Sequence, residues 1–373
     1  MILLKGFKPI TFESDLILLV SKKNKIFRYN IKEQRIKYLA SLPWSFKQKV
    51  FSINRIAYRI TRGGIKNGIV FGQSLYCAFS GIIWRIPLCD KANNAPHEVY
   101  RFRNGQSPLT FTLVDDSKSL LTSFSVGVYF GEYFSNPNKK EVNIYRINKL
   151  GAIENIFTFK TGLINHVHSI VFDTFRSCAW VLTGDFEKGA GIWQVFDNFN
   201  KVCCIVCGEQ KFRSCVAFAM KEGLLYATDS QFESNNIRLL KIADSSIKSI
   251  PLFSINGPSI YGTKLGKNFV FTTATEPKVG VNVSFKDIIC RDRAPGIVVN
   301  SSFVYLVTPK LELYQLFSKR KDYWPYYLAQ FGNILVPSGE NTSEYLVTYS
   351  VANRKNDQST EIRHLGEIKK MQL

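Results

Sequence analysis

Short apolar segments separated by turn residues recur along the whole chain, and helical periodicity is nearly absent. The segments are rich in Val, Ile, Tyr, Phe and Thr, and clusters of Gly, Asn, Asp, Ser and Pro separate them. β-Branched and aromatic residues favour strands, and such clusters mark turns. The pattern predicts an all-β protein.

Four of the apolar segments end in the same way, on an acidic residue. They are Val128–Glu132, Val181–Asp185, Leu225–Asp229 and Phe271–Glu276, and the acids stand 53, 44 and 47 residues apart. A four-stranded propeller blade takes roughly 40–50 residues. Two β-sandwich domains would explain the strands but not one recurring strand ending. We therefore expect a single β-propeller domain of six or seven four-stranded blades, spanning residues 1–373.

Further segments fit the same repeat. Leu75–Ser80 resembles an earlier member without the acid, and Val304–Thr308 and Tyr345–Tyr349 resemble later ones. Within one repeat, four strands are predicted at 168–173, 178–185, 192–196 and 201–206.

Residues 45–62 break the β pattern. Apolar residues at positions 46, 50, 53, 57 and 60 have spacings of 4, 3, 4 and 3, with Ser45 as a candidate cap and Gly63-Gly64 at the end. The spacing predicts one amphipathic helix, inserted between the first two blades. Basic residues are interspersed in it, namely Lys47, Lys49, Arg55, Arg59 and Arg62.

Positive charge is concentrated at the start of the chain. The protein has 49 Lys+Arg against 29 Asp+Glu, a net charge of +20, and residues 1–66 alone hold 15 basic and 3 acidic residues. The predicted helix could lie on an anionic membrane surface, or its apolar stripe could pack on the propeller. No nucleic-acid-binding module is recognisable, so no nucleic-acid partner is expected.

No apolar run approaches the roughly 20 residues that a membrane-spanning helix needs. The start Met1–Lys5 lacks the features of a signal peptide, so we expect a cytoplasmic protein, with the inner membrane face as a further option. Eight cysteines are then reduced thiols. Cys204 and Cys207 form a C-x-x-C without a second pair or a nearby His, so we interpret them as part of a buried strand.

The recurring acids and two histidines supply candidate chemistry. Equivalent strand ends of successive blades lie at the same end of a propeller, so Glu132, Asp185, Asp229 and Glu276 should surround one mouth of the channel. His166 and His168 should point to one side, because residues i and i+2 of a strand do so. Carboxylates bind sugar hydroxyls, aromatic rings cover sugar faces, and His or Glu can transfer protons. The nearby aromatic residues are Tyr133, Trp193 and Tyr261.

This arrangement favours a sugar-binding cleft. Two alternatives stay open: the two histidines and two carboxylates could be metal ligands, or the acids could cap loops by accepting backbone N–H groups. We assign no metal and no cofactor.

Part of the chain resembles a family of propellers. The segments Gly131–Asn136, His166–Ser169, Trp180–Asp185, Gly191–Trp193 and Tyr226–Asp229 resemble bacterial sialidase-like (BNR-repeat) proteins that are associated with polysaccharide loci. Sialidases carry Asp boxes of the form S-x-D-x-G-x-T-W. The nearest match here, Asn148–Gly151, lacks the Asp and the Trp, and no arginine triad is recognisable, so sialidase activity is not expected.

The resemblance implies a role with acidic glycans of surface polysaccharides such as capsule. Propeller lyases and glycosidases, an analogy of fold alone, use similar groups at the channel mouth. We therefore assign catalysis to His166, His168, Glu132 and Tyr133. We assign substrate binding to Asp185, Asp229, Tyr261, Glu276, Arg213 and Trp193, with Arg213 as partner of a sugar carboxylate. Whether the protein is an enzyme stays open: a lyase or glycoside hydrolase is one hypothesis, and a non-catalytic scaffold at a membrane or in a complex is the other.

Overall fold

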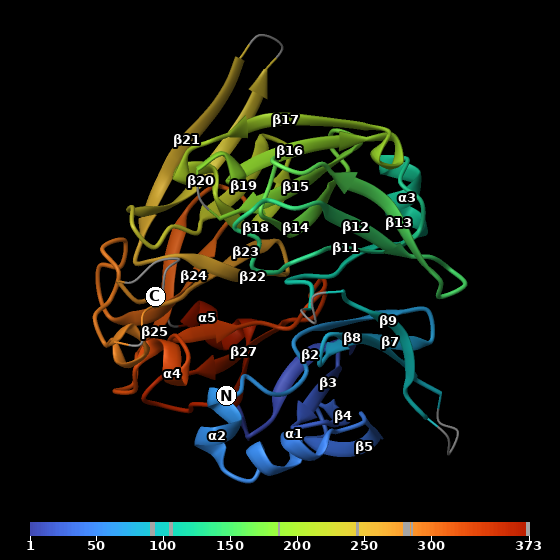
Figure 1. The fold of residues 1–373 in the computed structure, drawn as a ribbon, viewed down its shortest axis with the longest axis vertical. Helices are drawn as coiled ribbons and strands as arrows, with labels where there is room; N and C mark the ends of the chain where they lie inside the picture. The colour runs from blue at the N-terminus through green and yellow to red at the C-terminus, as the bar shows by residue number, and fades with distance from the viewer. Residues whose placement is uncertain are drawn as a thin grey trace.

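The strands form a ring of antiparallel blades. The computed structural model describes all residues except 90–93, 104–106, 186, 244–245, 279–283, 285 and 371–373, and in the described residues the strands form seven four-stranded sheets. Figure 1 shows these sheets arranged around a central axis. The expected propeller is therefore confirmed, with seven blades.

The first three blades follow one another along the chain, each from an inner to an outer strand. Blade 1 contains β2 (Lys8–Ser14), β3 (Ile17–Lys22), β4 (Lys25–Asn30) and β5 (Arg35–Ser41). Blade 2 contains β6 (Gly68–Phe71), β7 (Ser74–Phe79), β8 (Ile82–Pro87) and β9 (His97–Arg101). Blade 3 contains β10 (Thr112–Val114), β11 (Gly127–Gly131), β12 (Val142–Ile147) and β13 (Ile153–Phe159).

Blades 4 to 6 have the same order. Blade 4 contains β14 (His166–Asp173), β15 (Cys178–Gly184), β16 (Gly191–Phe196) and β17 (Lys201–Cys207). Blade 5 contains β18 (Ser214–Met220), β19 (Gly223–Thr228), β20 (Asn235–Ala243) and β21 (Ser246–Ile255), and Figure 1 shows its last two strands projecting from the ring. Blade 6 contains β22 (Ser259–Leu265), β23 (Asn268–Thr273), β24 (Ser301–Val307) and β25 (Leu313–Arg320).

Blade 7 joins the two ends of the chain. It contains β26 (Asn333–Leu335), β27 (Tyr345–Val351), β28 (Ser359–His364) and, as its outermost strand, β1 (Ile2–Lys5). The pairs run from Ile2 with Ile362 to Lys5 with Ser359. This pairing closes the ring, because the N-terminal strand completes the sheet that the C-terminal segment begins.

Short helices lie in the connections. The α-helices are α1 (Phe46–Phe51), α2 (Arg55–Ile60), α3 (Asp116–Thr122), α4 (Tyr326–Ala329) and α5 (Leu365–Lys370). The 3-10 helices are η1 (Glu187–Gly189), η2 (Asp197–Phe199), η3 (Gln210–Phe212) and η4 (Lys286–Ile289).

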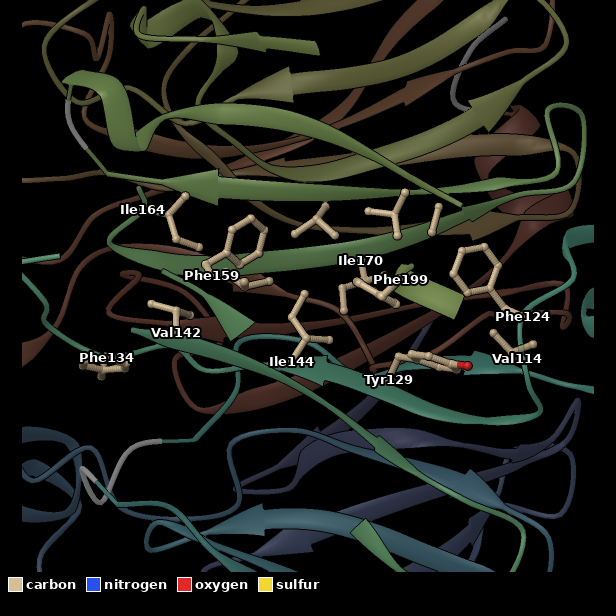
Figure 2. Close-up of a cluster of buried hydrophobic side chains, with 14 residues drawn as sticks. Val114, Phe124, Tyr129, Phe134, Val142, Ile144, Phe159, Ile164, Ile170 and Phe199 are labelled. Carbon is tan, nitrogen blue, oxygen red and sulfur yellow. The ribbon is translucent and has the colours of Figure 1, made fainter. Parts of the chain in front are cut away.

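Apolar side chains between neighbouring blades hold the ring together. Figure 2 shows the cluster between blades 3 and 4, in which Tyr129 and Ile144 of blade 3 pack with Phe199 and Ile170 of blade 4. Burial of one large apolar side chain stabilises a protein by about 1.5–3 kcal/mol. Both faces of most second strands are covered in this way, which is why their sequences are largely continuous apolar runs.

A buried carboxylate fixes the turn of the first hairpin of blade 4. Asp173 accepts hydrogen bonds from Trp180 Nε1 at 2.9 Å, Arg176 Nη1 at 2.9 Å and the backbone N–H of Phe175 at 2.9 Å. One side chain thereby satisfies a buried indole, a cation and the turn backbone.

Three predictions of detail were wrong. Val304–Thr308 belongs to the third strand of blade 6, not to a second strand, because β24 is also largely buried and has the same apolar pattern. Cys204 and Cys207 lie on β17 but are exposed, because β17 is the outermost strand of its blade.

The third difference is in the segment 45–62, where two short helices replace the single expected one. It does connect blades 1 and 2. Ser45 caps α1 in a capping box with Gln48, and Asn54 caps α2 through the N–H of Ile56. The first helix ends at Ser52 and the second begins after Asn54, because Ser and Asn favour helix caps over helix interiors.

Candidate functional site

A cavity of about 2310 Å³ runs along the axis of the ring and is lined by the inner strands of all seven blades. At the end where the inner strands begin, Tyr133, Cys215, Tyr261 and Glu276 line it. Of the four acids in the recurring strand ending, only Glu276 is among the described residues that line the cavity, whereas Asp185 and Asp229 contact Arg213.

The two histidines at the start of β14 face each other. Their Nε2 atoms are 3.0 Å apart, and the side chains are only 3% and 2% exposed. The Nδ1 atom of His166 is 3.0 Å from the carbonyl oxygen of Phe134, and that of His168 is 2.8 Å from the carbonyl oxygen of Ser214. Backbone from blades 3 and 5 therefore locks both rings.

Asp185 completes this pair from the end of β15. Its Oδ1 atom lies 3.3 Å from Nε2 of His166 and 3.7 Å from Nε2 of His168. Burial works against ionisation, but the two neighbouring histidine rings and the charge of Arg213 hold the pKa of Asp185 well below its usual range. The preceding Gly184 is required, because a Cβ there would lie 2.1 Å from Cε1 of His168.

Arg213, which immediately precedes β18, links the acids of two blades. Its guanidinium lies 3.3 Å from Asp185 Oδ1 and 3.3 Å from Asp229 Oδ2. Although burial alone would lower it, the carboxylates of Asp229, Asp185 and Glu276 raise the pKa of Arg213. Cys215 donates to Asp229 at 3.3 Å, and burial raises the pKa of this thiol well above its ordinary value. We call His166, His168, Asp185, Arg213, Cys215 and Asp229 the blade 4–5 cluster.

Among the four acids of the recurring strand ending, Glu276 is the one that lines the channel. Its carboxyl group is protonated, and so uncharged, in most molecules at neutral pH. Burial, followed by the negative charges of Asp229 and Asp185, raises its pKa to about 8. Burial also raises the pKa of Tyr261 to about 12 and that of Tyr133 well above its ordinary value. All three side chains line the cavity, so a ligand there meets groups that can donate hydrogen bonds.

Two predicted site residues are engaged elsewhere. The carboxylate of Glu132 accepts hydrogen bonds from Arg103 Nε at 3.0 Å and Nη2 at 2.7 Å, and from the backbone N–H of Asn143 at 2.9 Å. Trp193 packs against Phe159 in the core between blades 3 and 4. In these positions Glu132 fits the alternative role of a loop cap, and Trp193 is a core residue.

Tyr133 stands between the channel and the histidines. Its ring centroid is 4.4 Å from that of His166 and 6.0 Å from that of His168. It lines the cavity from the loop that follows β11. A ligand in the channel would therefore touch Tyr133 before it could reach His166.

The same mouth of the channel is strongly basic, which sequence reasoning missed. Lys8 lies at the start of β2, and Arg62 and Lys66 lie between α2 and β6. They belong to a larger set of basic residues that line the cavity, together with the acids Glu276 and Asp357. We call this set the basic mouth; its members are Lys5, Lys8, Lys22, Lys23, Arg59, Arg62, Lys66 and Arg354. The excess of basic residues among residues 1–66 was the feature of the sequence that could have indicated this basic mouth.

Three members of the basic mouth crowd one another. Burial and the charge of Lys66 lower the pKa of Lys8 to about 7, and burial and the charge of Arg62 lower the pKa of Lys66 to about 8. The Lys8 ammonium donates to the carbonyls of Ile65 and Lys66 at 2.7 and 2.8 Å. Among the described residues no carboxylate forms an ion pair with Lys8, Arg62 or Lys66.

Strand irregularities orient the side chains of the cluster, and no feature of the sequence predicted them. The inner strands of blades 4, 5 and 6 shift register between Val167 and Ser169, Ser214 and Val216, and Ser259 and Tyr261. Such bulges redirect side chains. His168 and Cys215 are the extra residues of the first two bulges, which explains why Cys215 joins the cluster although no motif marks it.

Sequence comparison finds no matching family model and no matching curated protein, whereas structural comparison finds many propellers. An oligogalacturonate lyase from Vibrio parahaemolyticus has 9% identity and a TM-score of 0.50, covering 89% of this chain and 86% of that one. The CNH domain of AfRom2 has 8% identity and a TM-score of 0.51, with 96% and 94% covered. A puromycin hydrolase has 9% identity and a TM-score of 0.53, with 90% of this chain and half of that one covered.

These likenesses establish the seven-bladed fold alone, because identity is so low. None of these three proteins is described as a sialidase or BNR-repeat protein, so that resemblance stays a prediction from the sequence.

Proposed function

We propose that this propeller binds an acidic oligosaccharide at the basic mouth and processes it there. The observation that carries the proposal is the group of Lys8, Arg62 and Lys66, three basic residues that line the channel and form no ion pair with a carboxylate among the described residues. An incoming anion is favoured here, because it offsets the burial and the mutual repulsion that together lower the pKa of Lys8 and Lys66.

Glu276 is the group best suited to the chemical step. In hydrolysis and in elimination alike, a C–O bond of the glycosidic linkage breaks and the departing oxygen takes up a proton. A carboxylic acid with a pKa of about 8 holds that proton at neutral pH and faces the cavity. The catalytic role that the sequence analysis gave to Glu132 thus passes to Glu276.

The fold is compatible with such a role. One protein of the same fold is a lyase of oligogalacturonate, an acidic oligosaccharide, although its likeness extends to the fold only.

Binding is tested by calorimetry with oligogalacturonate and with a neutral galactose oligomer of the same length. We expect binding of the acidic oligomer only, weakened by salt. Lys66→Ala should weaken it about 10- to 100-fold, since a hydrogen bond to a charged group contributes about 1.5–3 kcal/mol. Lys267→Ala, at the opposite end of the cavity, is the matched control. Equal losses in both variants, or equal binding of both oligomers, would contradict the proposal.

Processing is tested on the same oligomer by assaying both unsaturated product and new reducing ends. Glu276→Gln should retain binding and lose about 10²–10⁴-fold in rate, the usual contribution of a general acid. An unchanged rate would exclude Glu276 as the acid. Binding without any product would leave the protein a glycan-binding scaffold.

A second role, attachment to an anionic membrane, is favoured by the helices α1 and α2. Phe46 and Ile53 are 80% and 81% exposed, so these two residues of the apolar stripe do not pack on the propeller. Val50, Ile56 and Ile60 are exposed as well, and Lys49 stands among them. Apolar side chains flanked by cations suit a bilayer interface, where each basic residue adds about 1 kcal/mol.

Two parts of the original hypothesis change. Arg59 is buried in ion pairs with Asp322 and Asp357 and contributes no surface charge, and the side chains of Lys47 and Arg55 lie outside the described residues. In the described residues no helix is long and apolar enough to span a bilayer.

Liposome co-sedimentation tests the attachment. We expect binding to vesicles of phosphatidylglycerol and not of phosphatidylcholine, and its loss when Phe46 and Ile53 are both replaced by Ser. Leu150→Ser, at an equally exposed Leu (88%) in the turn between β12 and β13, should bind normally. Absence of binding to anionic vesicles at low salt would end this proposal.

A further inference from the structure

The two histidines of β14 present their free nitrogen atoms to one point. Each Nδ1 atom lies within hydrogen-bond distance of a backbone carbonyl, Phe134 O at 3.0 Å and Ser214 O at 2.8 Å. A carbonyl oxygen can only accept, so each Nδ1 carries a hydrogen and each neutral ring has its lone pair on Nε2. Metal-ligating histidines are fixed by this type of bond.

The spacing of the donor atoms matches a metal ion. Nε2 of His166, Nε2 of His168 and Oδ1 of Asp185 form a triangle with sides of 3.0, 3.3 and 3.7 Å. The circle through these three atoms has a radius of about 2 Å, and zinc binds nitrogen and oxygen ligands at about 2.0–2.2 Å. One ion can therefore contact all three atoms without moving any of them.

The environment also favours a cation at this point. Two nitrogen lone pairs 3.0 Å apart repel each other unless a proton or a cation lies between them. Both rings are almost fully buried and cannot turn away, whereas the side chain of Asp185 is 31% exposed and leaves a route for entry. Arg213 contacts the same oxygen at 3.3 Å, longer than a strong charge-assisted bond.

We infer that His166, His168 and Asp185 bind a divalent first-row transition metal, with Zn²⁺ as the probe. Two imidazoles and one carboxylate are a common ligand set for such ions, and three protein ligands leave a coordination position open. The inference stands on the geometry of these three residues and does not depend on the proposed glycan.

A second group, His168, Cys215 and Asp229, also has closely spaced donor atoms. In this group the Cys215 thiol donates a hydrogen bond to Oδ2 of Asp229 at 3.3 Å, which an ion would have to displace. The ion is therefore assigned to the side of Asp185.

Metal content and titration test the inference on the full chain. After treatment with a chelator and its removal, the protein should bind one Zn²⁺ per chain in calorimetry. Co²⁺ should give visible absorption bands that excess Zn²⁺ abolishes. The melting temperature should rise with Zn²⁺, since a ligand of the folded state stabilises it.

Variants identify the ligands. His166→Ala and Asp185→Ala should each weaken Zn²⁺ binding by more than about 100-fold, because loss of even an outer-shell partner costs 10- to 100-fold. His364→Ala, at an exposed histidine beside Glu344, is the control and should bind normally. If His166→Ala fails to fold, Zn²⁺ binding by Asp185→Ala, a change at a partly exposed residue, still tests the inference. Unchanged affinity in Asp185→Ala, or no stoichiometric binding to the native chain, would overturn the inference.

Discussion

Replacing Glu276 by Gln should stabilise the protein, and should do so increasingly as the pH rises. Glu276 is 6% exposed and close to the charges of Asp229 and Asp185, which together raise its pKa from 4.5 to about 8. Glutamine has nearly the same shape and carries no charge at any pH. The substitution therefore removes the cost of ionising a buried carboxyl group and leaves the packing unchanged.

The sign follows from proton linkage. In the unfolded chain Glu276 loses its proton near pH 4.5, whereas in the folded protein it keeps it up to about pH 8. Between these values the folded state binds more protons, so the contribution of this residue to stability falls as the pH rises. One pKa unit corresponds to about 1.4 kcal/mol, so the full gap amounts to about 5 kcal/mol above pH 8.

The assay is urea denaturation of native protein and variant at several pH values from 4.5 to 9. We expect Glu276→Gln to equal the native protein near pH 4.5 and to gain stability steadily up to about pH 8. Glu222→Gln, at an exposed acid that lines the other end of the cavity, should show no such trend. A difference between Glu276→Gln and the native protein that does not vary with pH would refute the assignment of a raised pKa, and with it the proposed proton donor.

Three further predictions concern local structure. Asp173→Ala should destabilise the protein by about 3–5 kcal/mol in urea denaturation, because Arg176 and the Trp180 indole lose their buried partner; a loss below 1 kcal/mol would contradict this role. Gly184→Ala should cost about 1–3 kcal/mol in the same assay, since its Cβ would overlap the His168 ring, and an unchanged stability would show that the ring can move freely. Arg59→Met should raise amide hydrogen exchange in residues 44–64 by releasing α2 from Asp322 and Asp357, and unchanged exchange would show that other contacts hold the helices.

The repeat in the sequence predicted most of the fold. Each blade buries the faces of its second strand between neighbours, so Val181–Gly184 and Leu225–Thr228 are apolar in the same way and end at the same place. That local constraint is readable without coordinates. The third strand β24 has the same pattern, however, and the sequence alone could not tell it from a second strand.

The candidate site was predicted in part. The period that defines the blades also brings Asp185, Asp229 and Glu276 to one end of the ring, and the His-x-His spacing brings two rings together. Glu132 has the same position in the repeat and yet binds Arg103, because a partner from another loop reaches it. Position along a strand determines where a side chain starts, and the surrounding side chains determine what it binds.

By itself, the sequence determined the strand content, the blade period, the positive charge of residues 1–66 and the end of the ring at which the acids gather. These properties depend on residues close to one another in the chain. Three features depend on the folded ring: Lys8 and Lys66 share a channel mouth, Phe134 and Ser214 orient the two histidines, and Glu276 lies among negative charges. Those contacts join different blades, and burial and charge at a point depend on everything that packs around it, so the physical chemistry of the site arises when the ring closes.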